Sequence, residues 1–218
     1  SDVFIHRVII FNMSEIFTSS SWVFTFLIVI FSIILHEIAH GYAAYIQGDE
    51  TAHRAGRLTL NPIPHIDIIG SIIVPLVAFS TAGTFFGWAK PVPYNVYNIR
   101  TKIGQAFVAG AGVMTNILIA VVAGIFFKIF VITGTLTEGL SIALFTIIGV
   151  NVSLAFFNLI PVPPFDGMAI LQALFPRLHI NSAIVYNPIY LVVAIILASV
   201  LYRIFMPFVF MVVNAILM

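Results

Sequence analysis

The stretch Ile34–Gly41 reads I-L-H-E-I-A-H-G and lies inside an apolar run from residue 22 to residue 46, in which Glu37 is the only side chain charged at neutral pH. A run of this length predicts a transmembrane helix, which needs about 20 apolar residues. At helical spacing His36 and His40 share one face, with Cβ atoms roughly 5–6 Å apart, so both imidazoles can bind one Zn²⁺. Glu37 follows about 100° round the helix, close enough to take a proton from a water at the metal.

An H-E-x-x-H pattern can also arise by chance, as a solvated polar patch on a soluble helix. Its surroundings here argue against that interpretation. One carboxylate and two imidazoles are costly in hydrocarbon unless they are satisfied, and such groups in a span usually mark a functional site. The motif therefore predicts a metal site within a membrane span.

The composition supports the membrane assignment. The chain has 218 residues, of which 61% are hydrophobic and 8% are charged, whereas a soluble domain carries about 25% charged residues. Mean hydropathy is +1.13. We expect one multi-pass integral membrane domain spanning residues 1–218. A net charge of +1 disfavours nucleic acid as a partner, and the absence of cysteine means that any zinc is held by nitrogen and oxygen.

The apolar segments define the expected architecture. The segments that can span, fully or nearly, are 22–46, 103–127, 139–161, 181–202 and the shorter 204–218, which contains Pro207. We predict an all-α polytopic membrane protein with about five to six transmembrane helices. Residues 66–82 are short and broken, and glycines, prolines and aromatics follow them, so 66–99 is expected to be a re-entrant extended or β segment. The polar loop 49–65 is expected to lack regular structure.

A third metal ligand is sought because a catalytic zinc usually has three protein ligands and one open position. Of the eight acidic residues, only Glu37 and Asp166 lie at functional ends of long apolar segments. Asp166 ends the stretch Asn158–Gly167, N-L-I-P-V-P-P-F-D-G, whose prolines stop a helix. Non-helical backbone at membrane depth is tolerated only when it is buried in protein or lines a wet cavity. Asp166 is therefore favoured as a ligand over a helix-end residue at the interface.

The two motifs together, H-E-x-x-H and N-x-x-P-x-P-x-x-D-G, resemble the site-2 protease family of intramembrane zinc metalloproteases, peptidase family M50. The loop at Gly48-Asp49, the stretch Arg57–Pro62 (R-L-T-L-N-P) and the stretch Phe86–Pro93 (F-G-W-A-K-P-V-P) are similar to its compact prokaryotic branch, which lacks PDZ and CBS domains. The resemblance covers roughly residues 22–175.

The resemblance implies a role for each matching residue. One zinc would be bound by His36, His40 and Asp166, and Glu37 would be the base. The substrate backbone would be bound by Asn158, Asn116, Phe86, Gly87 and Trp88. The family motif G-P-x-x-N has Val113 in place of its proline here. Two interpretations of Asn116 stay open: support of the substrate or oxyanion, and a helix–helix hydrogen bond.

One constraint gives the topology. Because His40 and Asp166 must meet at one metal, an even number of crossings separates them, so 66–99 is expected to dip into the membrane and return. Basic residues on the site side are Arg54, Arg57, Arg100, Lys102 and Arg177, with Lys90 nearby; the other side has Arg7 and Lys128. The positive-inside rule then places the site towards the cytoplasm. The resemblance implies that the membrane is a prokaryotic cell membrane.

The predicted function is an intramembrane zinc endopeptidase that acts on single-span membrane proteins in the lipid bilayer. Residues 84–93 are the candidate edge to which an unwound substrate strand adds; the alternative is a loop that plugs the bundle. Segment 181–218 carries no ligand candidate and is predicted to be a lateral gate, hinged near Arg203 and Pro207, or otherwise a simple turn between helices. The alternative function is a membrane metal-binding or metal-transport protein, although transporters usually offer polar groups along a path.

Overall fold

The computed structural model describes residues 22–74, 76, 80, 89–178 and 188–217, and in these ranges it contains helices but no strand. The long helices are α3 (Trp22–Ile46), α6 (Lys102–Ile132), α7 (Glu138–Asn158) and α10 (Pro188–Leu217). Three stretches are long and apolar enough to cross a membrane: Val23–Ile46, Lys102–Ile132 and Glu138–Asn158. The all-α prediction is thus confirmed for the described part, where three such helices stand against the five to six expected.

Local chemistry sets the helix ends. Helix α3 has the predicted bounds and ends before Gly48, whose φ of +98° is a left-handed conformation that glycine adopts easily. Helix α6 is capped by Thr101, whose side chain accepts from Gly104 N–H, and it ends at Ile132, two residues before Gly134, where φ is +67°. The prediction that α6 ends at residue 127 was wrong, because Lys128 does not break a helix and the next left-handed glycine does.

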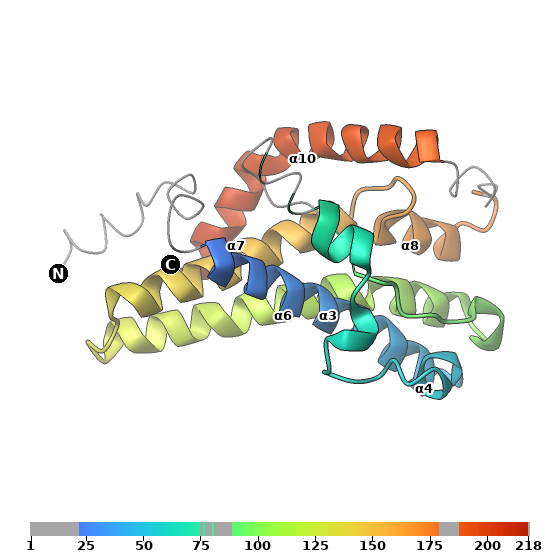
Figure 1. Cartoon of the computed structure of the whole chain (residues 1–218), viewed down its shortest axis with the longest axis horizontal. Coiled ribbons are helices and arrows are strands. Elements are labelled where there is room, and N and C mark those ends of the chain that lie inside the picture. Colours follow the sequence, from blue (N-terminus) through green and yellow to red (C-terminus); the bar gives the residue numbers. More distant parts are fainter. Residues whose placement is uncertain (1–21, 75, 77–79, 81–88, 179–187, 218) are drawn as a thin grey trace.

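Helices α6 and α7 run antiparallel and form the core of the bundle together with the end of α10 (Figure 1). The buried cluster joins two alanines and a phenylalanine of α6 to branched side chains of the other two helices: Ala120, Ala123, Phe127, Leu144, Ile148, Val152, Val209 and Val213. Small residues let membrane helices approach closely. A Cβ at Gly124 would overlap the side chain of Ile216, so this glycine allows α6 and α10 to touch.

Helix α10 covers the described part, residues 188–217, of both predicted C-terminal segments as one element, with Pro207 inside it. The prediction of two separate helices was therefore wrong. A proline removes one backbone hydrogen bond and kinks a helix, but it does not have to end one. Figure 1 shows that α10 changes direction along its length.

In its described residues, the connection between α3 and α6 contains the short elements α4 (Thr51–Arg54), the 3₁₀ turns Ile63–His65 and Val96–Asn98, and a π-helical stretch Ile68–Ile73. The expectation that 49–65 lacks regular structure was wrong at α4. There the Asp49 carboxylate accepts from the backbone N–H and the hydroxyl of Thr51 and so fixes the first turn. Lys90 N–H donates to His65 O at 2.8 Å, so the chain returns near residue 90 to the place it left at residue 65.

Candidate metal centre

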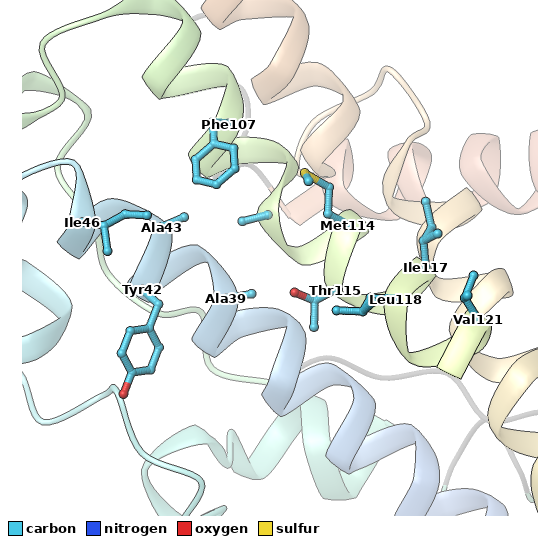
Figure 2. Close-up of a pocket in the computed structure, with 11 residues that line it drawn as sticks. Ala39, Tyr42, Ala43, Ile46, Phe107, Met114, Thr115, Ile117, Leu118 and Val121 are labelled. Atoms are coloured by element: carbon cyan, nitrogen blue, oxygen red, sulfur yellow. The ribbon is translucent and has the colours of Figure 1, made fainter. Parts of the chain in front are cut away.

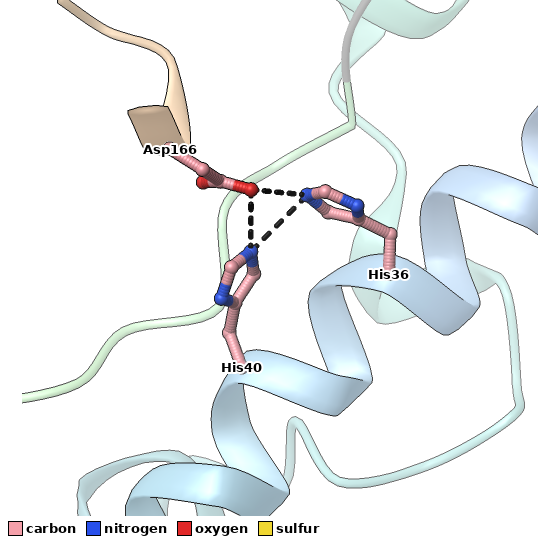
Figure 3. A group of neighbouring side chains, drawn as sticks. All are labelled: His36, His40 and Asp166. Carbon is pink, nitrogen blue, oxygen red and sulfur yellow. Dashed lines mark hydrogen bonds and ion pairs between the residues drawn. The ribbon is translucent and has the colours of Figure 1, made fainter. Parts of the chain in front are cut away.

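Three side chains converge where α3 meets the start of the short helix α8 (Asp166–Leu174). His36 Nε2 and His40 Nε2 lie 3.1 and 3.3 Å from Asp166 Oδ2, and the two Nε2 atoms lie 3.1 Å apart (Figure 3). In a tetrahedral zinc site with bonds of about 2.1 Å, the ligand atoms are about 3.4 Å from one another. The triangle of ligand atoms therefore has the size that one zinc ion requires.

Hydrogen bonds define the protonation of both imidazoles. His40 Nδ1 lies 2.7 Å from Val108 O, and a carbonyl can only accept, so the hydrogen is on Nδ1. His36 Nδ1 lies 2.6 Å from Asn116 Oδ1. Both Nε2 atoms then direct lone pairs at a buried Asp166 Oδ2 that has no hydrogen-bond partner in the described residues apart from the ion pairs with these rings. With both imidazoles neutral, three electron pairs face one another, an arrangement that a bound metal cation would satisfy.

Gly112 lets α6 pass beside the two rings. A Cβ at this position would overlap the ring of His36 and approach Nε2 of His40. The glycine is thus required by space rather than by backbone conformation, since no left-handed φ occurs at this residue.

The proline-rich turn after α7 positions Asp166. Helix α7 ends at Asn158, the chain turns through residues 159–165, and Asp166 is the first residue of α8. A Cβ at Gly167 would overlap Leu159 O, so the glycine allows the turn to fold tightly back on the helix end. The rings of Phe157 and Phe165, with centroids 4.7 Å apart, brace the two sides of the turn.

Glu37 lies beside the ligands, partly buried, and its Oε2 accepts from the backbone N–H of Val92 at 2.8 Å. The extended segment 89–95 thus runs along the site. Within it, the Tyr94 ring stacks on His40 with centroids 6.4 Å apart. Burial, together with the nearby carboxylates of Asp166 and Glu37, raises the pKa of Tyr94 to about 12, so its hydroxyl stays protonated.

Two buried charged side chains fasten this segment. Arg57 Nη2 donates to Lys90 O at 2.6 Å, which joins the R-L-T-L-N-P stretch to the K-P-V-P stretch. Asp49 accepts from Asn95 N–H and from Asn98 Nδ2, each at 2.7 Å, at the end of α3. Residues distant in sequence thus hold the segment that contacts the base.

The remaining predicted substrate residues have the following places. Asn158 is half-buried and donates one amide hydrogen to Leu154 O in its own helix. Asn116 is fully buried and contacts His36 and Asn151. Phe86, Gly87 and Trp88 lie outside the described residues. Sequence reasoning missed Asn151, although an asparagine inside the apolar run 139–161 is itself a signal, since it needs a buried partner.

An apolar pocket of about 630 Å³ lies along the outer side of α3 and α6 (Figure 2). Its lining consists of Ala39, Tyr42, Ala43, Ile46, Phe107, Ala111, Met114, Thr115, Ile117, Leu118 and Val121. Neither Glu37 nor any of the three ligand candidates lines it, so the reactive groups lie outside this pocket.

Comparisons with known proteins give the family. Residues 127–201, which include Asn158 and Asp166, match the family model "Peptidase family M50". The chain is 36% identical over 154 residues to "Putative zinc metalloprotease YwhC" of Bacillus subtilis (strain 168), an alignment that covers 67% of each protein. It is 27% identical over 156 residues to "Putative zinc metalloprotease Rip2" of Mycolicibacterium smegmatis, covering 70% of this chain and 59% of that protein. No solved structure matches the chain.

The fold, the H-E-x-x-H helix and these matches define a membrane zinc metalloprotease. The chain belongs to peptidase family M50, the site-2 protease family. The predicted family, enzyme class and zinc cofactor are confirmed. In this chain the residues that would hold the zinc are His36, His40 and Asp166, which supply two nitrogens and one oxygen.

Proposed function

We propose that the protein is an intramembrane endopeptidase that cleaves single-span membrane proteins within or near their transmembrane segments. One observation carries this proposal. The Glu37 carboxylate lies beside the cluster formed by His36, His40 and Asp166. Glu37 and the two histidines belong to α3, a helix that is apolar and long enough to cross a membrane. A base and a metal site at that place serve peptide bonds that also lie in the membrane.

The residues of the site divide the chemistry. Zinc, when bound, polarises the scissile carbonyl and makes a water more acidic. Glu37 is held through Oε2 by Val92 N–H, and no described residue donates to its Oε1. Oε1 is therefore free to take the proton of the attacking water, and the same carboxyl group then passes it to the leaving amine.

Substrate binding requires an unwound segment, because a transmembrane helix uses its own backbone hydrogen bonds. In the candidate edge 84–93, Lys90 N–H and Val92 N–H already donate to His65 O and Glu37. Pro91 and Pro93 have no N–H at all. The described part of this edge therefore offers a substrate mainly carbonyl acceptors. Donors would come from Phe86–Trp88 and from the second amide hydrogen of Asn158.

The proposed topology rests on where the chain returns. Residues 65 and 90 meet, which supports a re-entrant segment between them rather than a crossing. Helix α6 then leads away from the site and α7 leads back, so His40 and Asp166 share one side (Figure 1). The exposed cations on that side are Arg54, Arg100, Lys102 and Arg177. By the positive-inside rule we propose a multi-pass protein whose site faces the cytoplasm.

The test is Glu37→Gln in the full chain, with a single-span membrane protein as substrate. The amide keeps the shape of the side chain and can still accept from Val92, but it cannot take a proton. We expect unchanged zinc content and cleavage lowered by about 10²–10⁴-fold. Glu50→Gln, at an exposed ion pair with Arg54, makes the same chemical change and should cleave normally.

The same variant separates this proposal from metal transport. A transporter does not require the base. Normal zinc flux through Glu37→Gln, together with no cleavage by the wild-type protein, would therefore favour transport. Near-normal cleavage by Glu37→Gln would contradict the protease mechanism. Among the described residues the ligand cluster is one compact triangle and not a path, which also speaks against transport.

A further inference from the structure

A chain of buried hydrogen bonds leads from one zinc ligand into the centre of the bundle. His36 Nδ1 is 2.6 Å from Asn116 Oδ1 on α6, and Asn116 Nδ2 donates to Asn151 Oδ1 on α7 at 2.9 Å. Asn151 Nδ2 donates to Ser32 Oγ on α3 at 3.0 Å and to Ile147 O at 2.9 Å. Asn116 and Asn151 are both 0% exposed, so water does not compete for these bonds.

A backbone carbonyl fixes the direction of the whole chain. Ile147 O can only accept, so the amide nitrogen of Asn151 faces it, and Asn151 Oδ1 must face Asn116. Asn116 then presents its nitrogen to Asn151 and its Oδ1 to His36. The hydrogen of His36 is therefore held on Nδ1, and the lone pair of Nε2 points at the position of the metal.

The two zinc-binding histidines are oriented by different means. His40 relies on Val108 O, a backbone atom of α6 that any residue would supply. His36 relies on two side chains, and each of them would be a costly unpaired polar group in an apolar bundle if the chain were broken.

We propose that Asn116 and Asn151 are positioning residues that fix the tautomer and direction of His36 for zinc binding. The inference rests on the zinc site and not on the identity of the substrate. Under it, Asn116 acts on the metal ligand and not on the substrate backbone. Asn151 bonds to Asn116 and acts on His36 through it. Groups that orient metal ligands in this way typically contribute about 10–100-fold to metal affinity.

The test measures two quantities on the full chain in detergent: the zinc dissociation constant, by competition with a chelator, and the melting temperature of the zinc-free protein. We expect Asn116→Leu and Asn151→Leu each to weaken zinc binding by about 10–100-fold. Thr146→Val is the matched control, since Thr146 is buried on α7 and, among the described residues, its hydroxyl donates to Ile142 O of its own helix. Its zinc affinity should equal that of the wild type.

Two conservative variants keep the test decisive if a leucine variant does not fold. Asn116→Asp still accepts from His36 Nδ1–H, and Asn151→Asp, in its neutral form, still accepts from Asn116 and donates to Ser32. Both should bind zinc far more tightly than the leucine variants. Selective ¹⁵N labelling of histidine gives a third readout: the Nδ1–H resonance of His36 should shift in Asn151→Leu and not in Thr146→Val.

The outcomes separate positioning from helix packing. If the leucine variants have a lower melting temperature but the zinc dissociation constant of the wild type, the asparagines only join helices and the proposal is wrong. It is equally wrong if the aspartate variants lose as much zinc affinity as the leucine variants. Since neither measurement involves a substrate, these results stand whether or not the protein proves to be a protease.

Discussion

The carboxylate of Glu37 accepts a 2.8 Å hydrogen bond from the backbone N–H of Val92, 55 residues further along the chain. The bond ties the base on α3 to the extended segment that Arg57 and Asp49 hold in place. Since the donor is a backbone N–H, every residue type at position 92 supplies this hydrogen bond except proline, which has no N–H.

Val92→Pro tests whether this bond orients the base. Residue 92 already lies between two prolines in extended backbone, so the change removes the donor with little other constraint. A hydrogen bond to a charged group contributes about 1.5–3 kcal/mol, and its loss should lower kcat by about 10–100-fold. Zinc content should not change. Val92→Ala keeps the N–H and is the control; equal kcat values for the two variants would show that the bond does not matter for turnover.

Gly112→Ala should damage the zinc site, because the added methyl group overlaps the His36 ring. Gly110→Ala is the matched control on the same helix, where the nearest atom would be Ile170 Cδ1 at an ordinary 3.6 Å. In a helix the change from glycine to alanine otherwise stabilises by about 0.5–1 kcal/mol. We therefore expect lower zinc affinity in Gly112→Ala and an unchanged or higher melting temperature in Gly110→Ala. Normal zinc affinity in both would mean that α6 can move away from the histidines.

The buried Asp49 carboxylate makes the stability of the protein depend on pH. Burial raises its pKa, but hydrogen bonds from Thr51, Asn95 and Asn98 outweigh burial and leave the pKa below the ordinary 3.8. A carboxyl group with a lowered pKa in the folded state stabilises the fold above its unfolded pKa. That stabilisation is lost as pH falls below 3.8 towards the folded value.

Asp49→Asn removes this contribution. We expect a lower melting temperature than the wild type near neutral pH and a difference that shrinks as pH falls below about 4. Thermal unfolding of the zinc-free proteins at several pH values measures it. A difference that stays constant across this range would mean that ionisation of Asp49 does not stabilise the fold.

Local patterns predicted the parts of the site that depend on one element. The bounds of α3 and the shared face of His36 and His40 follow from hydropathy and from the helical repeat, both properties of neighbouring residues. Asp166 could be chosen because few acidic residues lie at the ends of apolar segments. The dip of 66–99 into the membrane, expected because two ligands must meet, stays a prediction, and the bond from Lys90 N–H to His65 O is consistent with it.

The parts that were missed depend on how helices face one another. Gly112 and Asn151 matter because of the rotation of α6 and α7 about their axes, and the sequence of either helix alone does not specify that rotation. The bond from Val92 to Glu37 involves a backbone atom, which leaves no signal in residue type. The continuity of α10 was missed for another reason: Pro207 is tolerated because the helix packs on its neighbours on the C-terminal side of it.

Pro207 divides helix α10 into two halves, and the position of the first half bears on how a substrate enters. After Pro207, Val209 and Val213 are buried against α6 and α7. Before Pro207, the described apolar side chains are largely exposed, namely Val193, Ile196, Leu197, Val200 and Ile204. In this first half Tyr190 OH donates to Pro163 O at 3.4 Å, three residues before Asp166. The first half therefore lies next to the turn that carries a zinc ligand.

We predict that this first half swings about Pro207 to admit a membrane substrate. The chain has no cysteine, so a pair introduced in the turn of α10 that carries Tyr190 and in the turn 161–164, at positions whose Cα atoms lie about 5.5–6 Å apart, has no native thiol to compete with it. The crosslink should block cleavage of a single-span substrate, leave zinc content unchanged and be reversed by reduction. A control pair joining Val213 to Ala123 in the packed half should not affect cleavage. Undiminished cleavage with the Tyr190 crosslink fully formed would place the entry route elsewhere, because the substrate would have reached the metal while this half of α10 was held against the site.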